Sequence, residues 1–111
     1  MIFITGPLYS GKRAYACQVL GCSMDALADR AVWDVQELAR GCGDLEALAD
    51  RLAEQDAVIA TDIGGGVVPI DAGEREAREA AGRLSCLLAR RADRVVRVFC
   101  GLPLALKGET P

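Results

Sequence analysis

The chain has 111 residues, of which 51% are hydrophobic, and this is enough for one domain with a substantial core. Its 13 basic and 16 acidic residues are interspersed and leave a net charge of −3, so no basic stripe can neutralise a nucleic-acid backbone. Composition therefore excludes nucleic acid as the main partner. Because there is no internal repeat and no shift in composition, residues 1–111 are expected to form a single domain.

No apolar stretch approaches the roughly 20 residues that span a bilayer, and residues 2–5 form a strand-like run in place of a signal segment. A cytoplasmic protein without membrane insertion is therefore expected. The five cysteines are odd in number and form no Cys-x-x-Cys pair, which favours reduced thiols, mostly small core residues, over a zinc site or a disulfide framework. They are Cys17, Cys22, Cys42, Cys86 and Cys100.

A glycine-rich loop near the N-terminus is the most informative segment. It follows the apolar residues 2–5 and precedes residues 14–20, which have the composition of a helix. Strand, loop and helix in this order are typical of a phosphate-binding P-loop, in which backbone N–H groups and the helix N-terminus face the phosphate and a lysine, here Lys12, reaches the outer phosphates. The predicted nucleotide-binding residues are Gly6, Pro7, Leu8, Tyr9, Ser10, Gly11, Lys12 and Arg13.

The last of these residues departs from the P-loop pattern. A Ser or Thr normally follows the lysine and coordinates Mg²⁺, whereas this chain has Arg13, and a guanidinium has no acceptor with which to hold a cation. Two poses are open. Arg13 turns outward and leaves Mg²⁺ to Asp34 and water, or it turns inward and substitutes for the charge of the metal. The inward pose is favoured here, and it predicts nucleotide binding that depends little on Mg²⁺.

Beyond the loop, candidate strands and helices alternate. Strands are expected at residues 31–35, 57–61 and 95–99, the last of which closes the pattern before Gly101 and Pro103. Such alternation predicts an α/β fold, a P-loop NTPase-like three-layer fold of reduced size with a mainly parallel sheet and helices on both faces.

Two of the expected helices carry start signals. Asp44 is placed to cap a helix over residues 44–54. Asp71 and Glu74 have the spacing of a capping box at the start of a longer helix with an apolar face.

Three loops of this fold leave the carboxyl ends of strands, where open α/β sheets bind ligands. The first is the glycine-rich loop. The second holds Asp34, which suits the acidic residue that orders a metal beside the terminal phosphates, although a solvated strand-end aspartate fits equally well. The third is either a loop that lets a substrate approach the backbone or an ordinary connector. Its candidate substrate residues are Thr61, Asp62, Gly64, Gly66 and Pro69.

Four segments, taken in order, resemble the adenosylcobinamide kinase/adenosylcobinamide-phosphate guanylyltransferase family of cobalamin nucleotide-loop assembly. They are residues 6–12, 60–69, 78–84 and 101–107. The segment 60–69 is the most specific, because it ends in Gly-Gly-Gly-Val-Val-Pro where the family has Gly-x-Gly-Ile/Val-Val-Pro. The resemblance implies ATP or GTP as substrate, a cobinamide-like corrinoid as acceptor, and a homo-oligomer, which is a trimer in the family.

The departures from the family pattern affect functional positions. The family's Asn-Glu pair is Thr61-Asp62 here, and a later helix Asn corresponds to Ser85. The family carries the histidine that receives the guanylyl group in a stretch that is shortened here to residues 21–30, and this chain has no histidine. Covalent guanylyl transfer as the family performs it is therefore expected to be lost.

Two functional hypotheses remain open. In the first, the chain is a minimal kinase with Lys12, Asp34 and Asp62 as catalytic residues, Asp34 as the metal residue, and Mg²⁺ in doubt because of Arg13. In the second, the chain is a catalytically degenerate nucleotide- or corrinoid-binding sensor or subunit.

Overall fold

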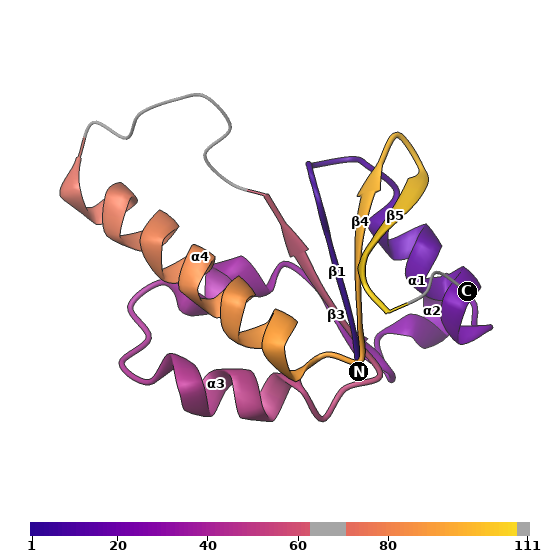
Figure 1. The fold of residues 1–111 in the computed structure, drawn as a ribbon, viewed down its shortest axis with the longest axis horizontal. Helices are drawn as coiled ribbons and strands as arrows, with labels where there is room; N and C mark the ends of the chain where they lie inside the picture. The colour runs from indigo at the N-terminus through magenta and orange to yellow at the C-terminus, as the bar shows by residue number, and fades with distance from the viewer. Residues whose placement is uncertain (63–70, 109–111) are drawn as a thin grey trace.

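A computed structural model describes residues 1–62 and 71–108 and shows one mixed α/β fold (Figure 1). The described strands form a five-stranded sheet in the order β2-β3-β1-β4-β5, in which β5 alone runs antiparallel to its neighbour. The expected α/β fold with a mainly parallel sheet is thus confirmed. In chain order the elements are β1 (Ile2–Gly6), α1 (Lys12–Leu20), α2 (Met24–Leu27), β2 (Ala31–Val32), the 3-10 helix η1 (Val35–Ala39), α3 (Leu45–Leu52), β3 (Ala57–Thr61), α4 (Ala72–Arg91), β4 (Arg94–Phe99) and β5 (Leu102–Lys107).

Helices cover both faces of the sheet, as the alternation of strands and helices predicts. The strands β1 and β3 are apolar at nearly every position because both of their faces are buried. Phe3 and Val58 pack beneath α3 and α4, whereas Ile4 and Ile59 pack against α1 and α2 on the opposite face. Figure 1 shows the same division, with α3 and α4 on one side of the strands and α1 and α2 on the other.

Strand register brings the ends of the central strands together. The pairing of β1 with β3 runs from Ile2 opposite Ala57 to Gly6 opposite Thr61, so both strands end at the same level. On the other side of β1, Thr5 lies opposite Arg97 of β4. The loops that follow β1 and β3 therefore leave the sheet side by side.

Both predicted helix caps are present. Asp44 Oδ1 accepts a hydrogen bond from the Ala47 N–H at 3.0 Å, and Asp71 Oδ1 accepts one from the Glu74 N–H at 2.7 Å. The Glu74 carboxylate does not complete a capping box, because it accepts a hydrogen bond from Arg40 at 3.1 Å. Each aspartate thus satisfies one N–H group that the helix itself leaves unpaired.

The sequence-based boundaries are wrong at two places. The strand expected at 31–35 ends at Val32, because Asp34 adopts a left-handed backbone conformation with φ of 56° and the chain continues into η1. Residues 95–99 do form a strand, as part of β4, but it is not the last one. Cys100 and Gly101 both have positive φ and turn the chain into a further strand, β5. Pro103 is tolerated in β5 because this strand lies at the edge of the sheet.

The cysteines differ in part from expectation. All five are free thiols, but three are only half-buried, and Cys86 and Cys100 are exposed, so none belongs to the fully buried core. In the described part of the chain, no helix combines the length and the apolar character needed to cross a bilayer.

Candidate functional site

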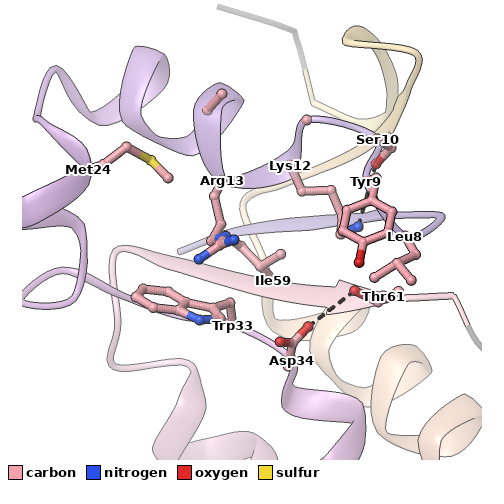
Figure 2. Close-up of a pocket in the computed structure, with 12 residues that line it drawn as sticks. Leu8, Tyr9, Ser10, Lys12, Arg13, Met24, Trp33, Asp34, Ile59 and Thr61 are labelled. Atoms are coloured by element: carbon pink, nitrogen blue, oxygen red, sulfur yellow. Dashed lines mark hydrogen bonds between the residues drawn. The ribbon is translucent and has the colours of Figure 1, made fainter.

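A cavity of about 420 Å³ opens at the carboxyl ends of β1, β2 and β3 (Figure 2). This volume lies within the range of small-molecule sites. Four stretches of chain meet there: the glycine-rich loop with the start of α1, the start of α2, the residues after β2, and the strand β3. The lining residues are Leu8, Tyr9, Ser10, Gly11, Lys12, Arg13, Ala14, Met24, Trp33, Asp34, Ile59 and Thr61.

Close packing fixes the glycine-rich loop at both of its ends. A Cβ atom on Gly6, whose φ is 153°, would lie 2.2 Å from the Val98 carbonyl oxygen, so only glycine fits there. At the other end, the Gly101 N–H donates a hydrogen bond to the Ser10 carbonyl oxygen at 2.8 Å and ties the loop to the β4–β5 turn. Gly6 and Pro7 do not line the cavity, whereas Tyr9 lines it although the residue is 94% exposed.

Lys12 is buried at the start of α1, with 7% of its surface exposed. Its Nζ donates hydrogen bonds to the Pro7 carbonyl oxygen at 2.5 Å and to Ser10 Oγ at 3.5 Å. Burial lowers the pKa of Lys12, while the nearby charges of Asp34 and Asp62 act to raise it. The N-cap residue Gly11 offers no side-chain cap, so the ammonium lies beside a helix N-terminus that no side chain covers.

Arg13 turns into the cavity and not outward along the helix. Its guanidinium lies over the indole of Trp33, with 5.5 Å between the guanidinium carbon and the ring centroid, and both residues line the cavity. In the view of Figure 2, the Arg13 guanidinium lies above the Trp33 ring, and the Lys12 side chain also lies above Trp33 and Asp34.

Asp34 and Thr61 meet at the floor of the cavity, as the parallel sheet predicts. The Thr61 hydroxyl donates a hydrogen bond to Asp34 Oδ1 at 3.2 Å (Figure 2). The Thr61 N–H donates to Gln36 Oε1 at 2.9 Å, and this buried glutamine holds the end of β3 against η1. The end of β3 is therefore joined to the segment that follows β2 by two hydrogen bonds.

Asp62 does not line this cavity. Its carboxylate accepts a hydrogen bond from the Thr5 hydroxyl at 2.9 Å and forms an ion pair with Arg97 at 2.7 Å. It faces a neighbouring cavity of about 220 Å³ that Thr61 also lines. The other residues around this second cavity are Thr5, Gln36, Arg78, Ala81, Gly82 and Ser85. The candidate substrate residues Gly64, Gly66 and Pro69 lie outside the described residues.

The donor set at the first cavity bears directly on Mg²⁺. Among the described residues, no group of three His, Cys, Asp or Glu side chains is arranged to hold a metal ion. Mg²⁺ in nucleotide sites is commonly held by one or two carboxylates, water and phosphate oxygens, and Asp34 beside the Thr61 hydroxyl fits that mode. Arg13, at the position where P-loops have a hydroxyl, contributes no ligand.

Sequence reasoning missed Trp33, Gln36 and Arg97. Arg97 had a detectable signal, because it is a charged residue in the middle of an apolar strand run, where a partner is required. Trp33 precedes Asp34 directly but was taken only as part of a strand. Gln36 gave no signal, because its role depends on the turn at Asp34 that the sequence pattern does not reveal.

Comparison with protein families finds a match that covers most of the chain. A protein-family model described as cobinamide kinase / cobinamide phosphate guanyltransferase matches residues 18–106, about four fifths of the 111 residues. The match includes Asp34, Thr61 and Asp62 and begins after the glycine-rich loop, so the assignment of the loop depends on its sequence pattern and geometry. No curated protein matches the chain.

Proposed function

The chain belongs to the cobinamide kinase / cobinamide phosphate guanyltransferase family, and on that basis we propose that it binds a nucleoside triphosphate in the cavity at Lys12 and transfers a phosphoryl group to a cobinamide-like corrinoid. The family acts in cobalamin biosynthesis and uses nucleoside triphosphates. That this short chain itself performs the kinase reaction is our proposal.

The observation that carries the proposal is the buried ammonium of Lys12 at an uncapped helix start. A buried cation is costly unless it is compensated, and within the described ranges the hydrogen-bond partners of this ammonium are one carbonyl and one hydroxyl. Phosphate oxygens would compensate the charge and would also accept hydrogen bonds from backbone N–H groups at the start of α1. The outer phosphates of the nucleotide are therefore assigned to this point.

Asp34 is the residue that would hold Mg²⁺, with the Thr61 hydroxyl beside it. When bound, the metal neutralises charge on the phosphate oxygens and helps to orient them. The remaining roles belong to the chain itself. Lys12 binds the outer phosphates, and the hydrogen bond from Thr61 keeps the Asp34 carboxylate facing the cavity.

The second cavity suits the acceptor. Thr61 lines both cavities, so a hydroxyl group bound in the smaller one would lie next to the phosphate site. Asp62 is held by the Thr5 hydroxyl and by the Arg97 guanidinium, and we assign it to positioning the acceptor, because these two contacts fix its carboxylate beside the smaller cavity. Arg78, from the family-like segment 78–84, and Ser85, the counterpart of the family's later helix Asn, line the same cavity.

A second function has one specific observation in its favour. Arg13 occupies the metal-ligand position and places a permanent positive charge in the cavity. If this charge replaces the metal, the protein binds nucleotide without phosphoryl transfer and acts as a sensor or subunit of the same pathway.

Titration calorimetry with ATP and GTP, each with and without Mg²⁺, followed by a phosphorylation assay with cobinamide, tests both hypotheses. Nucleotide binding with phosphorylated cobinamide as product supports the kinase. Binding without product supports the sensor or subunit. Absence of binding heat under every condition contradicts both.

A further inference from the structure

We propose that Trp33 is a positioning residue, whose indole holds the Arg13 guanidinium in the cavity as a second fixed cation for the phosphate chain. The inference rests on the proposed nucleotide binding, and it adds a means by which this site recognises polyphosphate through protein charges.

The first observation is the direction of two consecutive cations. Lys12 and Arg13 are neighbours in the first turn of α1, and successive helix residues point about 100° apart. Lys12 reaches back into the glycine-rich loop, whereas Arg13 reaches across the cavity to Trp33. The two positive charges thus lie at different places in the cavity (Figure 2). This arrangement suits a chain of phosphates more than a single anion.

The second observation is the partner that Arg13 has. Asp34 follows Trp33 directly and faces the same cavity, yet the ion pairs of residues 1–62 and 71–108 do not join Arg13 to Asp34. The guanidinium lies on an aromatic face, which orients a cation without cancelling its charge. Asp34 instead accepts a hydrogen bond from Thr61. The positive charge of Arg13 therefore remains available to an anion.

The third observation is the rigidity of the platform. Trp33 lies just beyond the two-residue strand β2 and packs against the core cluster that contains Ile4 and Ile59. The ring is thereby held in place, and a guanidinium that lies over it loses little further freedom when a ligand binds. An arginine held in advance binds phosphate better than one that is free to rotate in solvent.

A base-free ligand separates this role from stacking of a nucleobase on the same ring. We would measure the affinities of tripolyphosphate and of ATP in excess chelator, using calorimetry on the wild type and on Trp33→Leu, Trp33→Phe, Arg13→Gln and Trp33→Leu/Arg13→Gln. Arg51→Gln is the control for charge, because Arg51 is exposed on α3 and does not line the cavity. Thermal unfolding checks that each variant is folded.

Trp33→Leu and Arg13→Gln should each weaken both ligands by about tenfold, and the double variant should be within about twofold of Arg13→Gln, because the ring acts through the arginine. Trp33→Phe should retain most of the affinity, since a phenyl ring still offers an aromatic face. Additive losses in the double variant, a loss for ATP alone, or no loss in Trp33→Leu would overturn the proposal. Absence of binding by the wild type would overturn the proposed function as well.

Fluorescence gives a readout that does not depend on the folding of Trp33→Leu. Trp33 is the only tryptophan of the chain, so its emission reports on this ring alone. Tripolyphosphate should change the emission of the wild type, and Arg13→Gln should remove most of that change. Unchanged emission at saturating tripolyphosphate would contradict the proposed role of Trp33.

Discussion

Lys12 is the residue on which the proposed phosphate binding depends most directly. Lys12→Ala removes a buried ammonium, and the loss of one charge-assisted hydrogen bond costs about 1.5–3 kcal/mol. Nucleotide affinity should therefore fall by roughly ten- to a hundredfold in calorimetry. Lys107→Ala is a matched control, because Lys107 donates to the carbonyl oxygens of Ala89 and Arg90 at the end of α4, away from the cavity. Equal affinity of Lys12→Ala and the wild type would contradict the assignment of the loop.

The pH dependence of binding offers a second test of Lys12. Burial lowers its pKa from the ordinary value of 10.5, so in the free protein the ammonium loses its proton at a lower pH than an exposed lysine does. Only the charged form attracts phosphate. Affinity should thus begin to fall as the pH rises towards 10.5 from below, whereas Lys12→Arg should show no such fall, because a guanidinium stays charged. Parallel pH profiles for the two proteins would exclude Lys12 as the titrating group.

Single residues also show where sequence reasoning succeeds. The sequence pattern places Asp34 and Thr61 where two strands reach their carboxyl ends, and in the structure a hydrogen bond joins their side chains. The sequence pattern places Asp62 in the same loop as Thr61, but its carboxylate faces Thr5 and Arg97 and not the cavity that Thr61 and Asp34 line. Which side of the sheet a loop residue faces depends on the backbone turn at the strand end, and the sequence pattern does not contain that information.

At the scale of elements, hydrophobic patterning predicts the central strands well and the edges poorly. The run at residues 57–61 is β3 to the residue, because a strand buried on both faces must be apolar throughout. Two other elements, α2 and η1, have only four and five residues, too few for periodicity to show. The sequence pattern does not predict β5, because Gly101 and Pro103 are typical of a strand end, whereas in the structure Gly101 forms a hairpin turn.

Gly6, at the junction between β1 and the glycine-rich loop, should be the position of β1 that tolerates a larger side chain least. Gly6→Ala places a Cβ against the Val98 carbonyl oxygen and forces a backbone shift in β4 or in the loop. Overpacking together with backbone strain should lower the free energy of unfolding by about 2–4 kcal/mol in chemical denaturation. The control is Gly21→Ala, where φ is also positive but no atom lies within 4 Å, and a loss of about 1 kcal/mol is expected. Similar losses at both positions would exclude steric contact as the cause.

At the scale of the whole molecule, the apolar residues of the β4–β5 hairpin bear on assembly. Phe99, Leu102, Leu104 and Leu106 are each more than half exposed, and β5 is an edge strand. Exposed apolar edges favour association between chains. A homo-oligomer, with the trimer implied by family resemblance, stays our prediction. Light scattering at micromolar concentration checks it, and Leu104→Lys should shift the distribution towards monomer. A wild type that is monomeric under these conditions would contradict it.

The composition of the whole chain is the basis of the prediction that the guanylyl half-reaction is lost. Covalent transfer through a phosphoramidate needs a nitrogen nucleophile, and the chain contains no histidine. Among the described residues that line the cavity, the other nitrogen nucleophile is Lys12, whose Nζ is engaged in hydrogen bonds to the Pro7 carbonyl oxygen and to Ser10 Oγ. After incubation with radiolabelled GTP, no acid-labile, base-stable adduct should remain on the protein, as measured by filter binding after denaturation. The Lys12→Ala variant makes the result interpretable. A stoichiometric adduct on the wild type would contradict the predicted loss of this reaction, and its disappearance in Lys12→Ala would place the guanylyl group on the lysine.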